Sequence, residues 1–313
     1  MLYTITLNPS LDLAVRVKEL KPGMTNRSSD EYFQAGGKGL NVSAVLKALG
    51  FESIAIGYAA GFVGAEILRL SKEQGLRTDF ILLDRGCSRI NFKIREGDDA
   101  NILSETEVNG SGPLIDAAGA DALYEKLEHL TVGDTLIISG SAPPGRGPEL
   151  YDGIPAKISQ KGVRFVADTS GKNLLKTLKY RPFLVKPNLA ELSELAGREL
   201  SGPEEVSSFA KDLLNMGAEN ILVSMGEEGA LLLTQDNRVL VCKAPTGRVI
   251  NSVGAGDSMV AGFVAGYIEK GDFEYALKLA VASGSACAFS RFLPLRDEIL
   301  PLLDHIDIRS CRR

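Results

Sequence analysis

The sequence has few of the residues that build metal centres, disulfides or histidine-based catalytic sites. Its four cysteines are far apart and form no CxxC pair, and its two histidines stand alone. Zinc sites and histidine relays need such residues in closely spaced sets. The sequence therefore argues against both kinds of site and favours a cytoplasmic protein with reduced thiols.

Long apolar runs and blocks of one charge are also missing. No stretch approaches the roughly 20 apolar residues of a membrane helix, and the N-terminus lacks the basic start and apolar segment of a signal peptide. Lys and Arg number 35 against 40 Asp and Glu, a formal charge of −5. Nucleic-acid and anionic-membrane binders depend on a basic surface, so neither is expected as a partner.

The composition is that of a globular protein, with 44% hydrophobic and 24% charged residues among 313. Short apolar runs alternate with segments of helical period, such as a helix predicted at 42–49 and ended by Gly50. This alternation implies right-handed crossovers and an α/β fold with a mainly parallel sheet covered on both faces. The predicted strands include 3–7, 53–57, 135–139, 163–167, 183–185 and 221–223.

Two segments, 11–18 and 89–95, instead alternate apolar and polar residues one by one. Such one-sided strands are typical of a small sheet with one polar face. We interpret them as a lid over the main domain, which would turn Asp12 and Arg89 toward a ligand. The alternative is a pair of edge strands whose polar faces lie in solvent.

The strongest chemical signal is the segment 251–258, NSVGAGDS, followed by apolar residues at helical spacing. Gly254-Ala255-Gly256 at a helix start lets backbone N–H groups approach an anion, and the helix dipole favours negative charge there. Asp257 then has two interpretations. It caps the helix, or it accepts a proton from a substrate hydroxyl beside a bound phosphate.

Three further segments each have a structural and a functional interpretation. Ser224–Gly229 is a glycine turn between two strands or a turn whose hydroxyl and amides meet a polyphosphate. Asn188 and Glu191, three apart at a helix start, form a capping box or organise a hydrated Mg²⁺. The segment 139–145 is a plain strand-to-helix connection or a ligand loop at a strand's carboxyl end.

The glycine-rich segment 35–41, AGGKGLN, brings backbone close to a small group and offers Lys38 and Asn41 as polar contacts. It is not a Walker A loop, because Gly39 stands where that motif has Ser or Thr. No GxGxxG occurs either, which removes the usual dinucleotide fingerprint. The small-residue helix 282–288 indicates close helix packing or one wall of a purine pocket.

Taken together, the motifs resemble those of the ribokinase-type (PfkB) carbohydrate kinases over nearly the whole chain. The N-terminal glycine signature matches Gly36-Gly37-Lys38-Gly39-x-Asn41, the C-terminal one matches 254–257, and the Asn-x-x-Glu motif matches 188–191. The segments 6–12, 88–94 and 105–110 are similar to the branch that acts on phosphorylated ketohexoses. Ser88, Phe92 and the segment 290–292 depart from the common pattern.

The resemblance implies a single ribokinase-like chain over 1–313. It would have a three-layer α/β/α domain and small-sheet lid strands at approximately 11–35 and 88–108, with a homodimer through the lid. It also implies ATP-dependent phosphorylation of a ketohexose phosphate, with fructose 1-phosphate giving fructose 1,6-bisphosphate. Tagatose 6-phosphate and fructose 6-phosphate are alternative substrates, and a non-catalytic sugar-phosphate sensor is the alternative from another class.

Site roles are implied by the same resemblance. Asp257 would be the base, and the backbone of Gly254, Ala255 and Gly256 would stabilise the transferred phosphoryl group. Mg²⁺ would be held, through water, by Asn188 and Glu191. The residues implied to bind ATP are Lys186, Asn188, Ser224, Gly226, Gly229, Asn251 and Gly256. The residues implied to bind the sugar phosphate are Asp12, Gly36, Gly37, Lys38, Asn41, Arg89 and Asn91.

Overall fold

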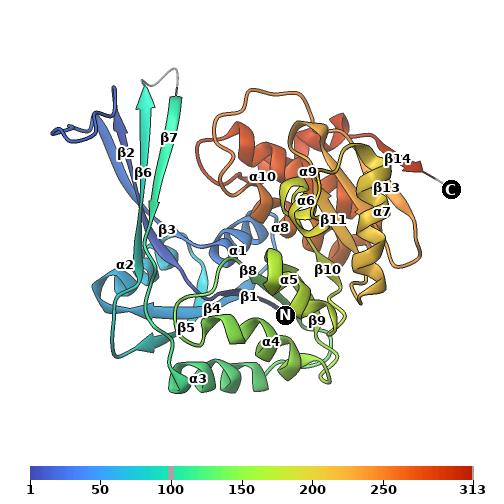
Figure 1. Cartoon of the computed structure of the whole chain (residues 1–313), viewed down its shortest axis with the longest axis horizontal. Coiled ribbons are helices and arrows are strands. Elements are labelled where there is room, and N and C mark those ends of the chain that lie inside the picture. Colours follow the sequence, from blue (N-terminus) through green and yellow to red (C-terminus); the bar gives the residue numbers. More distant parts are fainter. Residues whose placement is uncertain (98–101, 312–313) are drawn as a thin grey trace.

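A computed structural model of the chain describes residues 1–97 and 102–311; residues 98–101 of the predicted lid range 88–108 lie outside it. Two sheets organise the molecule (Figure 1). A ten-stranded sheet runs through the body, and a four-stranded sheet stands at one side of it. No helix in the described ranges is long and apolar enough to cross a membrane.

The large sheet has the order β14-β13-β12-β11-β10-β9-β8-β1-β4-β5. Its seven strands from β5 to β11 pair in parallel, and β12, β13 and β14 add on in antiparallel. The strands are β1 (Leu2–Thr6), β4 (Ser53–Ala60), β5 (Arg77–Leu83), β8 (Thr135–Ser139), β9 (Arg164–Asp168), β10 (Leu184–Val185), β11 (Ile221–Ser224), β12 (Ala230–Leu233), β13 (Val239–Cys242) and β14 (Ile308–Cys311).

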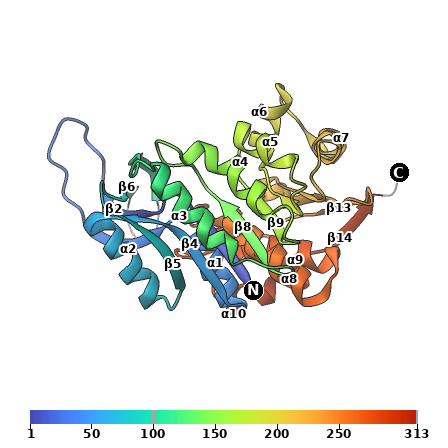
Figure 2. The same ribbon diagram turned by 90° about the horizontal axis from the view of Figure 1, so that it is seen from below.

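Helices cover both faces of this sheet (Figure 2), because successive strand residues bury their side chains on opposite sides. Ile137 packs in a cluster with α1 (Lys38–Ala48), α8 (Ala255–Lys270) and α9 (Phe273–Phe289), whereas Ile138 packs on the opposite side. The three-layer prediction is confirmed. The helices of the opposite side are α3 (Ala117–Glu128), α4 (Gly147–Ile158), α5 (Gly171–Leu178), α6 (Leu189–Ala196) and α7 (Gly202–Asn215).

The small sheet has the order β3-β2-β6-β7 and is made of β2 (Ser10–Val17), β3 (Asp30–Gly36), β6 (Arg89–Gly97) and β7 (Ile102–Asn109). The two alternating segments of the sequence are its central strands, β2 and β6, which pair in parallel. The interpretation as solvated edge strands is therefore wrong. Both edges are taken by β3 and β7, and the polar side chains of Asp12 and Lys93 are buried.

The two faces of the small sheet differ in chemistry. Near the body, its apolar face packs on α2 (Gly61–Glu73), which also lies against β4 and β5. Farther out the same face carries Phe33, Phe92 and Val108, which are 53%, 43% and 57% exposed. The opposite face is polar and turns toward the body of the molecule.

Two helix starts carry the segments singled out in the sequence. Helix α1 begins at Lys38, four residues before the predicted start at 42. Its N-cap is Gly37, whose φ of 130° is readily adopted only by glycine. Helix α8 begins at Ala255 after Gly254, whose φ is 86°.

The small-residue segment 282–288 lies in α9, which packs against α8. A Cβ on Gly284 would come within 2.5 Å of Met259 Cγ. This close contact supports the packing interpretation of that segment.

Candidate active site

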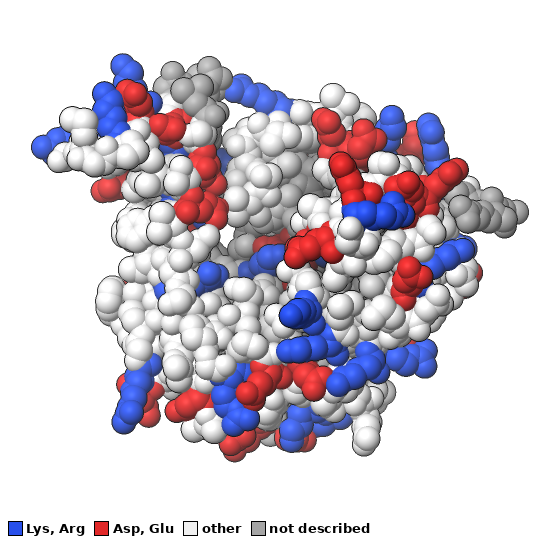
Figure 3. Space-filling view, in the orientation of Figure 1, with Lys and Arg blue, Asp and Glu red and all other residues white. Residues whose placement is uncertain are grey.

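A cavity of about 1060 Å³ lies between the polar face of the small sheet and the starts of α1 and α8. Figure 3 shows the hollow between the small sheet and the body, with acidic and basic side chains interspersed over this face. Strand carboxyl ends, where open α/β sheets bind ligands, contribute to it. The predicted site residues that line it are Asp12, Gly37, Lys38, Asn41, Arg89, Asn91, Lys186, Asn188, Glu191, Ser224, Asn251, Gly254, Gly256 and Asp257.

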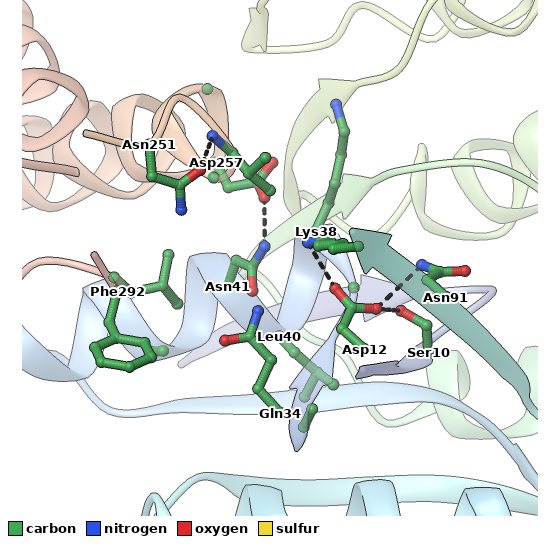
Figure 4. Close-up of a pocket in the computed structure, with 18 of the residues that line it drawn as sticks. Ser10, Asp12, Gln34, Lys38, Leu40, Asn41, Asn91, Asn251, Asp257 and Phe292 are labelled. Atoms are coloured by element: carbon green, nitrogen blue, oxygen red, sulfur yellow. Dashed lines mark hydrogen bonds and ion pairs between the residues drawn. The ribbon is translucent and has the colours of Figure 1, made fainter. Parts of the chain in front are cut away.

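Asp257 is the third residue of α8 and is only 4% exposed. Its Oδ2 accepts a hydrogen bond of 2.8 Å from Asn41 Nδ2 in the first turn of α1 (Figure 4). No side chain caps α8, so the interpretation of Asp257 as a helix cap is wrong. The carboxylate is turned across the cavity toward α1, where it is available to a bound group.

Asp168, at the end of β9, is a member of this site that the sequence analysis missed. Its carboxylate lies 3.2 Å from the Nζ of Lys186 and 3.5 Å from the Nζ of Lys38. Lys186 Nζ in turn rests on the start of α8, where a Cβ on Gly256 would come within 3.1 Å of it. We call Lys38, Asp168, Lys186 and Asp257 the buried quartet after its three buried members; the side chain of Lys38 is 45% exposed. The position of Asp168 in the sequence could have indicated it, because this residue is the last of a buried strand, as Ser224 is.

The two acids of the buried quartet titrate in opposite directions. Burial alone would raise the pKa of Asp168, but the ammonium groups of Lys186 and Lys38 outweigh it and hold that pKa below its usual range. Burial, and then the charge of Asp168, raise the pKa of Asp257 to about 6. Asp168 is therefore a fixed anion and Asp257 a carboxyl that exchanges its proton near neutral pH.

The polar face of the small sheet presents Asp12 with three donors (Figure 4). Ser10 Oγ and Asn91 Nδ2 donate to Oδ1 at 2.6 and 3.1 Å, and Lys93 Nζ lies 2.9 Å from Oδ2. Gly36 gives this carboxylate its room, since a Cβ there would come within 2.6 Å of Oδ1. The Oδ1 of Asn91 is buried with no hydrogen-bond partner among the described residues, which marks it as an acceptor for a ligand.

Arg89 differs from its neighbours on this face. Lys93 pairs with Asp12, and Arg95 pairs with Glu105 at 2.5 Å. The Nε of Arg89 donates to the backbone carbonyl of Asn8 at 3.1 Å, and within the described ranges no carboxylate forms an ion pair with it. Its guanidinium is therefore available to an anion in the cavity.

The predicted phosphate turn is a β-hairpin connection between β11 and β12. Gly226 and Gly229 adopt φ values of 60° and 90° that shape the turn, and they do not line the cavity, whereas Ser224 does. Ala255 and Gly36 likewise lie outside the lining.

Asn188 and Glu191 form the predicted capping box at the start of α6. Asn188 Oδ1 accepts from the Glu191 N–H at 2.7 Å, and Glu191 Oε2 accepts from the Asn188 N–H at 2.9 Å. Both side chains still line the cavity with carboxylate and amide oxygens. Among the described residues, no cluster of three His, Cys, Asp or Glu side chains suits a metal ion. A metal here would depend on water and ligand oxygens as well.

The loop after α9, which belongs to the body, contacts the small sheet. Arg291 pairs with Asp30 of β3 at 2.7 Å, and the rings of Phe292 and Tyr32 meet edge to face with centroids 5.5 Å apart. The segment 290–292, where the chain departs from the common family pattern, thus lies at the mouth of the cavity beside the small sheet.

The raised pKa of Asp257 predicts that Asp257→Asn stabilises the protein at alkaline pH. A carboxyl whose folded pKa is raised lowers the free energy of unfolding as the pH rises from its ordinary pKa to the folded pKa of about 6, and the full loss persists above that pH, because the buried group is then charged. Asparagine is neutral at every pH. Thermal unfolding at pH 8 is expected at a higher temperature for the variant than for the wild type, and the difference should vanish near pH 4. A lower unfolding temperature at pH 8 would contradict the assigned direction.

Comparison with known proteins agrees with this geometry. The model of the pfkB family carbohydrate kinases matches residues 6–291. The 1-phosphofructokinase of Bacillus subtilis is 41% identical over 98% of this chain and 99% of its own. The D-tagatose-1-phosphate kinase of Bacillus licheniformis is 38% identical over 94% of both chains.

Solved structures give the same result. Phosphofructokinase-2 of Escherichia coli, in complex with fructose-6-phosphate, superimposes with a TM-score of 0.89 over 97% of this chain and 98% of its own, at 29% identity. The resemblance inferred from the glycine signatures is confirmed. The chain belongs to the pfkB family of carbohydrate kinases, and it is an ATP-dependent sugar-phosphate kinase.

Proposed function

We propose that this kinase transfers the terminal phosphoryl group of ATP to the free primary hydroxyl of fructose 1-phosphate, giving fructose 1,6-bisphosphate. The observation that carries the proposal is one cavity that joins the buried carboxylate of Asp257 to the guanidinium of Arg89. The first can take a proton from a hydroxyl, and the second can hold a phosphate. A ketohexose phosphate has these two groups at opposite ends.

The sugar phosphate binds against the small sheet. The guanidinium of Arg89 offers a planar pair of donors to the phosphate that the sugar already carries. Partial burial strengthens such a charge-assisted contact. Asp12, Asn91 and Asn41 take the sugar hydroxyls beside the backbone of Gly37, and Gly36 leaves room for the carboxylate of Asp12. The buried, unpartnered Oδ1 of Asn91 supports this assignment, since a hydroxyl would satisfy it.

ATP binds on the other side of the cavity. Its phosphates meet Ser224, Asn188 and Lys186, with Asn251 beside them and Gly226 and Gly229 shaping the turn. The amide N–H groups at the start of α8, from Gly254 to Asp257, point at the transferred group, and the helix dipole adds positive potential there. Because Lys38 pairs with Asp168 in the buried quartet, we assign it to the transferred group rather than to the existing phosphate.

Asp257 is the general base in this scheme. As the hydroxyl oxygen bonds to the γ-phosphorus and the bond to the β-phosphate oxygen breaks, the hydroxyl proton passes to Asp257 and ADP leaves. Such transfers are achieved mostly by positioning and by stabilising charge. In this scheme the ammonium groups of Lys38 and Lys186 stabilise that charge.

Mg²⁺ fits the oxygens of Asn188 and Glu191, since it keeps several waters and takes one or two carboxylates plus substrate phosphates. Both side chains would hold it through water, and the ion would neutralise phosphate charge when bound. The capping box does not prevent this, because Glu191 keeps its second carboxylate oxygen and Asn188 Oδ1 keeps a second lone pair outside the helix cap.

A ketohexose 1-phosphate is favoured over the 6-phosphates because 1-phosphofructokinases and a D-tagatose-1-phosphate kinase are among the relatives. Tagatose 1-phosphate is therefore the second candidate substrate. A non-catalytic sensor is disfavoured, since binding alone needs neither a base nor the buried quartet.

The substrate is tested by following ADP release with Mg-ATP and, in parallel, fructose 1-phosphate, tagatose 1-phosphate, fructose 6-phosphate and tagatose 6-phosphate. We expect fructose 1-phosphate to have the highest kcat/KM by about tenfold, a difference of about 1.4 kcal/mol in transition-state binding. Preference for a 6-phosphate would contradict the assignment, and no turnover of any of the four would favour the sensor.

The pKa of Asp257 predicts the pH dependence of turnover. A base works only when ionised, so kcat/KM should fall as the pH drops through about 6 and be level above it. Asp257→Asn should lower kcat by about 10²–10⁴-fold, the usual contribution of a general base. Near wild-type turnover in this variant, or an acid limb near pH 4, would contradict the role.

Arg89→Ala should weaken binding of the sugar phosphate without changing the chemical step. The expected result is a rise in KM for the sugar phosphate of about tenfold or more with kcat retained, the pattern of a lost ground-state contact. Lys47→Ala is the control, since its Nζ donates to backbone carbonyls at 2.8 and 2.9 Å in the same cavity wall. Equal KM values for the wild type and Arg89→Ala would remove Arg89 from the site.

We also propose that the small sheet is a lid and that two copies pair through its outer face. An apolar strip is exposed on this face and consists of Phe33, Phe92 and Val108. Exposed apolar patches of this kind mark interaction sites. One structural relative, phosphofructokinase-2 of Escherichia coli, is described as a tetramer in its inhibited form. Sedimentation of the wild type and of Phe92→Glu tests the pairing, with a dimer expected only for the wild type.

A further inference from the structure

Lys93 is a charged group of the cavity that the proposed reaction leaves without a role. It projects from β6, it is 5% exposed, and its Nζ lies 2.9 Å from Oδ2 of Asp12. Asp12 is itself 5% exposed. A buried carboxylate is strongly disfavoured unless a cation and hydrogen bonds compensate it. Among the described residues, Lys93 is the cation that forms an ion pair with Asp12.

The register of the small sheet explains how Lys93 reaches Asp12. In the parallel pair of β2 and β6, Asp12 lies opposite Asn91, and Ala14 lies opposite Lys93. Lys93 is thus a diagonal neighbour of Asp12, and its Nζ reaches Asp12 Oδ2 at 2.9 Å. Ala14, which lies opposite Lys93, has only a methyl side chain. The alternation of β6 thus places Lys93 on the cavity side and turns Phe92 to the outer face.

The hydrogen bonds of Asp12 show what the pair accomplishes. A carboxylate has about four lone-pair positions. Oδ1 accepts from both Ser10 and Asn91, so its two positions are filled. Oδ2 accepts from Lys93, which leaves one position, on the oxygen that the lysine orients.

We propose that Lys93 is a positioning residue for the sugar phosphate. It pairs with Asp12 and fixes Oδ2 so that one sugar hydroxyl can donate to it. This inference rests on the proposed function, in which Asp12 takes a hydroxyl of the substrate. Lys93 acts through Asp12 and needs no contact with the substrate.

The first test is Lys93→Met, which keeps the stem and removes the charge. We expect KM for the sugar phosphate to rise about tenfold or more, with kcat and KM for ATP within about threefold of the wild type. Arg95→Met is the matched control. Arg95 is on the same face of β6, is as buried and also forms an ion pair, but with Glu105. An unchanged KM in Lys93→Met, or an equal rise in Arg95→Met, would overturn the proposal.

The second test is a double-mutant cycle with Asp12→Asn and Lys93→Met. Since Lys93 acts through Asp12, the double variant should have the same sugar-phosphate KM as Asp12→Asn, within about twofold. A further tenfold rise would show an independent contact with the substrate and would overturn the proposal. The double variant leaves no unpaired buried charge, so this comparison decides the matter even if Lys93→Met alone does not fold.

The two hypotheses fail in different ways. A wild type that phosphorylates none of the ketohexose phosphates overturns both the proposed function and this inference. A wild type that is active, together with a Lys93→Met variant of unchanged KM, overturns only the role of Lys93.

Discussion

The anion of Asp168, held between Lys38 and Lys186 and closed off from water, is the constraint on which the rest of the site depends. It fixes two ammonium groups where β9, β10 and α1 meet. It also acts on Asp257 through space, because a second negative charge nearby makes ionisation less favourable. The carboxylate of Asp168 thus positions the ammonium groups of Lys38 and Lys186 and also contributes to the raised pKa of Asp257.

The fold explains why these groups meet. Parallel strands end on one edge of the sheet, and β9 and β10 deliver Asp168 and Lys186 there side by side. Helices α1 and α8 begin at the same edge with Lys38 and Asp257 in their first turns. Glycines allow the close approach, since a side chain on Gly256 would meet the ammonium of Lys186.

The small sheet completes the cavity by a different rule. Its central strands β2 and β6 alternate apolar and polar residues, so one face is mostly polar and the other mostly apolar, and a shift of one residue would exchange them. The polar face holds Asp12 with its three donors, and it holds Arg89, which forms no ion pair with a carboxylate of the described residues. The apolar face packs on α2 near the body and is exposed farther out.

Much of this was predictable from local patterns. The alternation in β2 and β6 predicted a one-sided sheet, and the glycine signatures located the starts of α1 and α8. Asp168 was not predictable in this way, because it is a lone acid after an ordinary strand and gains its role only when Lys38 and Lys186 fold onto it. The partners of Asp257 and Asp12 depend likewise on tertiary contacts with Asn41 and Lys93.

The central claim is that burial, together with the charge of Asp168, raises the pKa of Asp257 to about 6. Carbon NMR titration of the aspartate carboxyl groups in the ligand-free protein, assigned with Asp257→Asn, measures it most directly. The account predicts that the signal absent from the variant titrates with a pKa of about 6. A value at or below the usual range for aspartate would contradict it.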